Sequence, residues 1–155
     1  MDRDALIDDY LASSRRLREG VAGLAPDQLK LRPIAGKWST LEVVCHLADF
    51  EIVFADRIKR VIAEDQPALP SGDEKLFVAR LRYHDRDADN ELALVEAIHR
   101  QIAAILRTLP AEDFQRTGIH AEAGPLTLET LVRRAAGHIA HHLKFVDEKR
   151  RAMGM

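Results

Sequence analysis

Four segments of this chain repeat apolar residues at steps of three and four, and this pattern restricts the fold more than any other feature. The segments cover about residues 4–24, 39–64, 90–109 and 127–146. Residues at this spacing fall on one face of a helix. Such helices become stable mainly when their apolar faces pack against one another. The sequence therefore predicts an all-α fold, a four-helix bundle formed by one domain over residues 1–155.

The second predicted helix has the best defined start. Ser39 can accept a hydrogen bond from the amide of Glu42, and the Glu42 side chain can reach back to the amide of Ser39. This reciprocal arrangement is a capping box, which is typical of a helix N-terminus.

A long loop is predicted between helices 2 and 3, over residues 65–88. Its early part contains Pro67, Pro70 and Gly72, and residues 73–81 could form a short helix. Connections of this length are unusual in a compact bundle and often serve as lids or binding loops.

Three histidines fall on predicted apolar faces of two helices: His46, His138 and His142. The last two are four residues apart, so both rings can reach one ion, and His46 supplies a third direction from another helix. Three protein ligands leave a position for water or substrate, as in catalytic zinc sites. Solvated or hydrogen-bonded histidines remain the alternative, because one pair at this spacing also arises by chance. Burial favours the metal, since an unpartnered buried imidazole is costly.

Two further residues are candidates for catalysis. Asp49 follows His46 by nearly one helical turn, so its carboxylate could accept a hydrogen bond from the second ring nitrogen of His46. A surface acid is the alternative reading of Asp49. Tyr83 lies in the long loop and would reach the site if that loop closes over it as a lid.

The remaining polar residues near these segments have simpler interpretations. We expect Cys45 to pack as a small apolar residue and His141 to lie at the rim of the site. Arg57 is expected to form a salt bridge with an acid such as Glu51, and His99 is expected at the surface.

Charge and composition exclude several classes of partner. The net charge is −2, with 23 Lys and Arg alternating with 25 acids, which gives no basic patch for a nucleic acid. The single cysteine forms no internal disulfide. No stretch approaches the ~20 apolar residues of a membrane span, and the N-terminal sequence does not resemble a signal peptide. A cytoplasmic protein is expected.

The segments around the histidines resemble the motifs of the DinB/YfiT-like superfamily of metalloenzymes. WSTLEVVCHLADFE, residues 38–51, looks like the first motif, and HIAHHL, residues 138–143, resembles the second. The resemblance implies a four-helix bundle that binds one divalent ion, with His46, His138 and His142 at the matching positions. The resemblance implies zinc or nickel as the bound ion, and a site of three histidines can also accept iron or manganese. It further implies that the chain can form a homodimer.

A metal held by three neutral ligands can activate water or a thiol as a nucleophile. The resemblance implies both uses, because the superfamily includes thiol S-transferases and hydrolases. We therefore expect a metal-dependent enzyme acting on a small-molecule substrate, with transfer of a low-molecular-weight thiol ahead of hydrolysis. A non-enzymatic alternative is a metal-binding stress-response bundle or dimeric binding module.

Overall fold

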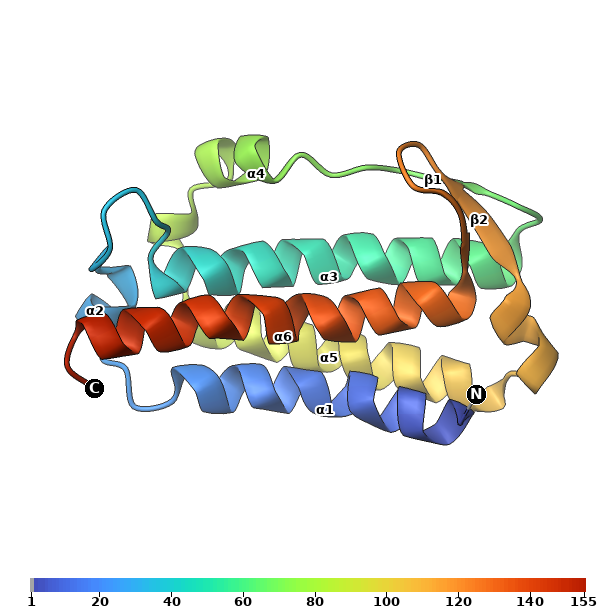
Figure 1. The fold of residues 1–155 in the computed structure, drawn as a ribbon, viewed down its shortest axis with the longest axis horizontal. Helices are drawn as coiled ribbons and strands as arrows, with labels where there is room; N and C mark the ends of the chain where they lie inside the picture. Colours follow the sequence, from blue (N-terminus) through green and yellow to red (C-terminus); the bar gives the residue numbers. More distant parts are fainter. Residues whose placement is uncertain (1) are drawn as a thin grey trace.

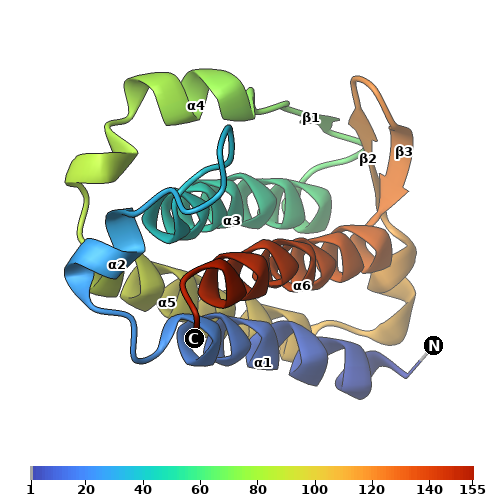
Figure 2. The ribbon, with the colours of Figure 1, turned by 60° about the vertical axis from the view of Figure 1, so that its left-hand side comes forward.

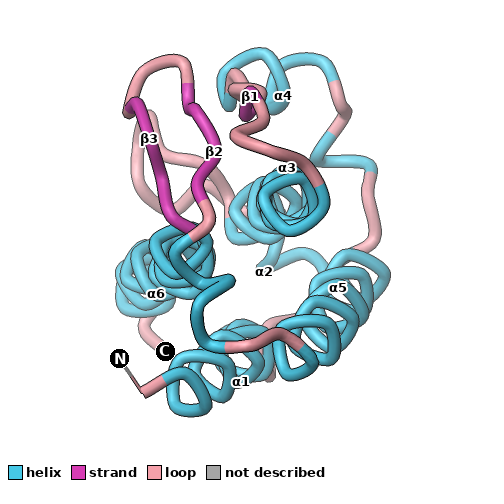
Figure 3. The backbone as a smooth tube through the Cα atoms, turned by 90° about the vertical axis from the view of Figure 1, so that its right-hand side faces the viewer, coloured by secondary structure: helices cyan, strands magenta, loops and turns pink. Residues whose placement is uncertain are grey.

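The computed structural model describes residues 2–155, and its main body is a bundle of four long helices (Figure 1). These are α1 (Arg3–Val21), α3 (Thr40–Ala63), α5 (Ala88–Thr108) and α6 (Leu128–Ala152). Both α1 and α3 pack against α5 and α6, so α1 and α3 lie at opposite corners of the bundle. The end-on view in Figure 3 shows this arrangement. The predicted all-α four-helix bundle is confirmed.

The direction of the helices explains the long connection between α3 and α5. These two neighbours run in the same direction, so the chain must return along the length of the bundle before α5 begins (Figure 1). A helix of 24 residues, such as α3, spans roughly 36 Å. Residues 64–87 cover this distance and carry β1 (Ala68–Leu69), α4 (Glu74–Arg80) and a single 3₁₀ turn, Tyr83–Asp85. The short helix expected over residues 73–81 is confirmed as α4, which lies outside α3 (Figure 2).

The structure also contains a small three-stranded sheet near the C-terminal end of α3, which the sequence does not predict. After a 3₁₀ turn at Ala111–Gln115, β2 (Thr117–His120) pairs antiparallel with β3 (Gly124–Thr127) and parallel with β1. Gly118 permits close packing on α3, because a Cβ there would lie 2.8 Å from side-chain atoms of Leu69 and Val61. Strands of two to four residues carry too little alternation to be recognised in the sequence.

The start of α3 is fixed as the sequence predicts. Ser39 Oγ accepts a hydrogen bond from the Glu42 amide at 3.1 Å, and a Glu42 carboxylate oxygen accepts one from the Ser39 amide at 2.7 Å. Arg32 forms an ion pair with Glu42. A short preceding helix, α2 (Pro26–Lys30), packs against α3.

A buried polar cluster joins α1, α3 and α5, and it corrects the expectation that His99 is a surface residue. His99 is fully buried, with Nε2 2.9 Å from a Glu51 carboxylate oxygen and Nδ1 2.9 Å from the Tyr10 carbonyl. The rings of His99 and Tyr10 are stacked, with centroids 4.0 Å apart.

Arg57 does not form the expected salt bridge with Glu51. Its Nε donates to the Pro70 carbonyl at 2.9 Å, and its guanidinium lies 5.7 Å from the centre of the Phe54 ring. Arg57 thus holds the returning segment against α3, whereas Glu51 faces the bundle interior. None of the described helices has a stretch long and apolar enough to cross a membrane.

Candidate metal centre

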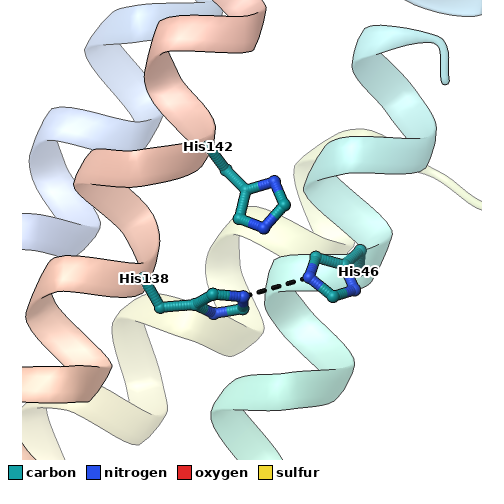
Figure 4. A group of neighbouring side chains, drawn as sticks. All are labelled: His46, His138 and His142. Atoms are coloured by element: carbon teal, nitrogen blue, oxygen red, sulfur yellow. Dashed lines mark hydrogen bonds between the residues drawn. The ribbon is translucent and has the colours of Figure 1, made fainter. Parts of the chain in front are cut away.

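His46 on α3 and His138 and His142 on α6 converge between the two helices (Figure 4). One ring nitrogen from each histidine can be chosen so that all three lie within 4.8 Å of one another. The Nε2 atoms of His46 and His138 are 3.0 Å apart. The structure therefore brings together the three residues that the sequence selects.

The donor set fits a divalent ion. Nitrogens at about 2.0–2.1 Å from a tetrahedral ion lie about 3.4 Å from one another, which is within the range seen here. In addition, the Nδ1 atoms of all three rings are buried and have no hydrogen-bond partner among the described residues. The Nε2 atoms of His46 and His138 face each other and would contact an ion held between α3 and α6, whereas the unpartnered Nδ1 atoms are a separate cost of burying the rings. The three-histidine cluster could therefore bind a metal.

The electrostatics of the cluster keep its rings neutral. Burial lowers the pKa of His46 and of His138 to about 3, and each ring gains a smaller lowering from neighbouring histidines. Burial also lowers the pKa of His142 to about 4, and His141 adds to the effect. Metal binding requires neutral imidazoles, so no proton has to be displaced from these rings near pH 7.

Aromatic side chains surround the histidines. The ring of His46 lies 5.2 Å from Trp38 and 4.6 Å from Phe50, and that of His138 lies 5.7 Å from Phe54. Ring contacts to the cluster come from α3, α6 and the segment before α3, and none comes from α1 or α5 within residues 2–155. The cluster thus lies between α3 and α6.

A cavity of about 300 Å³ opens beside His142. Its lining comes from the loop before α3, from α3, from α4 and from α6, and comprises Gly36, Lys37, Trp38, Val43, Glu74, His141, His142, Phe145 and Lys149. His141 lines this cavity and stands outside the cluster, as expected. The cavity gives a small molecule access to His142.

Asp49 does not form the predicted hydrogen bond with His46. Its carboxylate binds Arg86 through two hydrogen bonds of 2.9 and 3.0 Å, and Arg86 also pairs with Glu91. Two carboxylates around one guanidinium form a strong charge-assisted network. Asp49 is therefore engaged on another side of α3, and its predicted orienting role is wrong.

Tyr83 does not reach the site either. It is almost completely buried, its carbonyl oxygen accepts a hydrogen bond from Cys45 Sγ at 3.6 Å, and Arg86 lies 5.3 Å from its ring centre. The 3₁₀ turn thus packs on α3 away from the histidines, because Tyr83 fills an apolar position beside Leu41 and Cys45. Burial raises the pKa of Cys45 to about 12, which agrees with its expected role as a packing residue.

Lys149 also lies at the site, and its position in the sequence carries a signal of this. Lys149 follows His142 by seven residues and Val146 by three, so it falls on the same helical face. The residue is only 3% exposed and lines the cavity.

The fold and the cluster define a class of protein: a small helical bundle with a candidate three-histidine metal centre between two helices. Residues 10–146 match the DinB superfamily. The chain belongs to this family.

Relatives agree with this assignment. YfiT of Bacillus subtilis, named as a candidate metal-dependent hydrolase, is 31% identical over 90% of this chain and 79% of its own. A protein of Oceanobacillus iheyensis named in the same way is 32% identical over 85% of this chain and 76% of its own. The solved structure of YfiT, described as a four-helix bundle of unusual topology, superposes with a TM-score of 0.90 at 29% identity, over 98% of this chain and 87% of that one. A DinB-like protein of B. subtilis shares the fold at a TM-score of 0.66 and 20% identity, over 97% of this chain and 92% of that one.

Proposed function

We propose that this protein is a metal-dependent enzyme that holds one divalent ion through His46, His138 and His142 and activates a nucleophile there. The observation that carries the proposal is the convergence of three neutral histidines, His46 and His142 buried and His138 half-buried, with a cavity opening beside His142. When bound, the ion supplies its full positive charge, which lowers the pKa of a coordinated water or thiol.

The residues around the cluster support this chemistry. Uncharged ligands leave the charge of the ion uncompensated, and the aromatic side chains of Trp38, Phe50 and Phe54 restrict water on one side. Electrostatic effects are larger in such a water-poor site than in bulk solvent. The cavity beside His142 admits the second reactant.

A low-molecular-weight thiol is the nucleophile that the site favours. Hydrolysis usually needs a general base beside the attacking water. No carboxylate forms a hydrogen bond with the three histidines in the described part of the chain, and Asp49 and Glu91 are held by Arg86. A thiol is acidic enough to lose its proton to solvent on coordination without such a base. Its sulfur would then form a bond to an electrophilic carbon as the leaving group departs from that carbon.

Hydrolysis is the second candidate, because the curated relatives are named as metal-dependent hydrolases. Glu74 and His141 line the cavity and are the groups from which a base would come. A third alternative is a metal-stabilised bundle without enzymatic activity, acting as a stress-response dimer or binding module.

We propose zinc or nickel as the ion, because imidazole suits both, and iron or manganese as less favoured occupants. The experiment compares protein loaded with each ion in two assays. One follows consumption of 1-chloro-2,4-dinitrobenzene with cysteine or another small thiol, and the other follows hydrolysis of p-nitrophenyl acetate without thiol.

Thiol-dependent turnover that disappears in the His142→Ala variant supports S-transfer, and thiol-independent ester cleavage with the same dependence supports hydrolysis. The His141→Ala variant controls for loss of a histidine outside the cluster. Full metal occupancy without turnover on a broad panel of electrophiles and esters would favour the non-enzymatic alternative.

A further inference from the structure

The cavity beside His142 is lined by two lysines in addition to this candidate ligand. Lys149 comes from α6 and is almost completely buried, whereas Lys37 comes from the loop before α3 and is exposed. The other walls combine the apolar side chains of Trp38, Val43 and Phe145 with one acid, Glu74, and with His141 and His142. With two lysines against one acid, the cavity combines an excess of positive charge with a surface suited to a compact apolar group.

Lys149 has no acidic partner. Its Nζ donates to the Phe145 carbonyl at 3.0 Å and lies 5.9 Å from the centre of the Phe145 ring. No carboxylate lies within ion-pair distance of Lys149 among residues 2–155. An ammonium group has three donors, so the single carbonyl leaves most of its hydrogen-bonding capacity unused.

The burial of this cation needs an explanation. Burial lowers the pKa of Lys149, and Lys37 adds to the lowering, while Glu148 and Glu42 oppose it. A lysine in the last turn of a helix is favoured by the helix dipole. The dipole does not account for burial, however, because Arg151 occupies the same last turn and is exposed. A buried charge without a partner is costly, and the cavity is the side from which an anion can reach it.

We propose that this cavity binds an anionic group of the substrate, a carboxylate on a compact apolar body, with Lys149 as its main partner and Lys37 at the rim. The proposal rests on the proposed function, since it specifies the substrate of the same site. The carboxylate would complete the hydrogen bonds of Lys149, and Trp38 and Phe145 would contact the apolar body. The reactive part of such a molecule would then face His142.

The test uses Trp38, which is the single tryptophan of the chain and lines the cavity. The full-length protein, freed of metal with a chelator, is titrated with phenylacetate and with the uncharged phenylacetamide while Trp38 fluorescence is recorded. Without metal, an anion cannot gain affinity by coordination. We expect phenylacetate to bind about tenfold more tightly than the amide, as is typical of a charge-assisted hydrogen bond.

Substitutions at two lysines of α6 locate the effect. Lys149→Met should remove the preference for the acid, whereas Lys144→Met, at an exposed position of the same helix, should retain it. Lys149→Arg should retain part of the preference, and Lys37→Met, at an exposed site, should reduce it without affecting folding. Equal affinities for acid and amide in the unsubstituted protein, or an unchanged preference in folded Lys149→Met, would overturn the proposal.

Metal content separates this proposal from the proposed function. Lys149→Met should bind as much metal as the unsubstituted protein, because Lys149 is not part of the cluster. A Lys149→Met variant that loses the preference for phenylacetate but still binds metal fully supports the cavity proposal. If the unsubstituted protein prefers phenylacetate but binds no metal, the cavity proposal stands and the proposed metal-dependent function is contradicted.

Discussion

His99 Nε2 lies 2.9 Å from a Glu51 carboxylate oxygen, and both side chains are completely buried. This pair connects α5 with α3, and the Tyr10 carbonyl connects it with α1. Burial raises the pKa of Glu51, while the hydrogen bond and the charge of His99 oppose the shift. The pair thus places hydrogen-bonded polar groups in the bundle interior, where a single unpaired member would be costly.

The His99→Leu variant should be destabilised by about 3–5 kcal/mol, because it leaves Glu51 buried without its partner. The double variant Glu51→Leu/His99→Leu should recover part of this loss. Urea unfolding measures both, and a loss below about 1 kcal/mol in His99→Leu would contradict the role given to the pair.

Removing the cap of α3 should destabilise the protein with little effect on the metal site. Ser39→Ala deletes the acceptor for the Glu42 amide and is expected to cost about 1–2 kcal/mol. Asp87→Ala removes the corresponding cap of α5 at an exposed position, so its loss should be smaller. Thermal unfolding tests the ranking, and a reversed order would show that burial does not strengthen the Ser39 cap.

Two glycines should respond in opposite ways to alanine. Gly137 lies on an exposed face of α6 with nothing within 4 Å of an added Cβ, so Gly137→Ala should stabilise by about 1 kcal/mol. Gly118→Ala places its methyl group against Leu69 and Val61 and should destabilise by about 1–3 kcal/mol. Shifts in the urea midpoint measure both changes. Equal shifts would refute the close packing of β2 on α3.

The stability of the metal-free protein should fall as the pH is lowered from about 6.5 towards about 4. Burial holds the pKa of His46 and His138 at about 3 and that of His142 at about 4, below the ordinary value of 6.5. Below pH 6.5 the unfolded chain therefore takes up protons that the folded chain does not, which favours unfolding. Urea titrations at several pH values measure the slope of the free energy of unfolding against pH.

The slope should be smaller in the His138→Ala variant, which lacks one of these histidines. A free energy of unfolding that rises on acidification over this range would contradict the buried, neutral state of the cluster.

Features that depend on interactions between residues close in sequence can be predicted from the sequence of this chain. The helical stripes, the Ser39 cap and the spacing of His138 and His142 are set by residues within one or two turns, so they can be read directly. The partner of Asp49 is Arg86, 37 positions away, and no local pattern reveals it. The position of Tyr83 is likewise not set locally, since it depends on how the returning segment, residues 64–87, packs on α3.

His99 shows a different failure. It follows Val95 by four residues and precedes Ile102 by three, so the periodicity places it inside the bundle. The expectation of a surface position rests on the polarity of the imidazole, which the position on the helix overrides. A buried histidine needs a partner, and Glu51 on α3 becomes visible as that partner only when the helices are packed together.

The central claim is tested most directly by elemental analysis of the purified protein, supplied with zinc or nickel, beside the His142→Ala and His141→Ala variants. His141 is adjacent to the cluster and outside it, which makes it a matched control. The account predicts about one metal ion per chain in the unsubstituted protein and in His141→Ala, with the ion lost from His142→Ala. Negligible metal in all three, or equal metal in both variants, would contradict a centre formed by His46, His138 and His142.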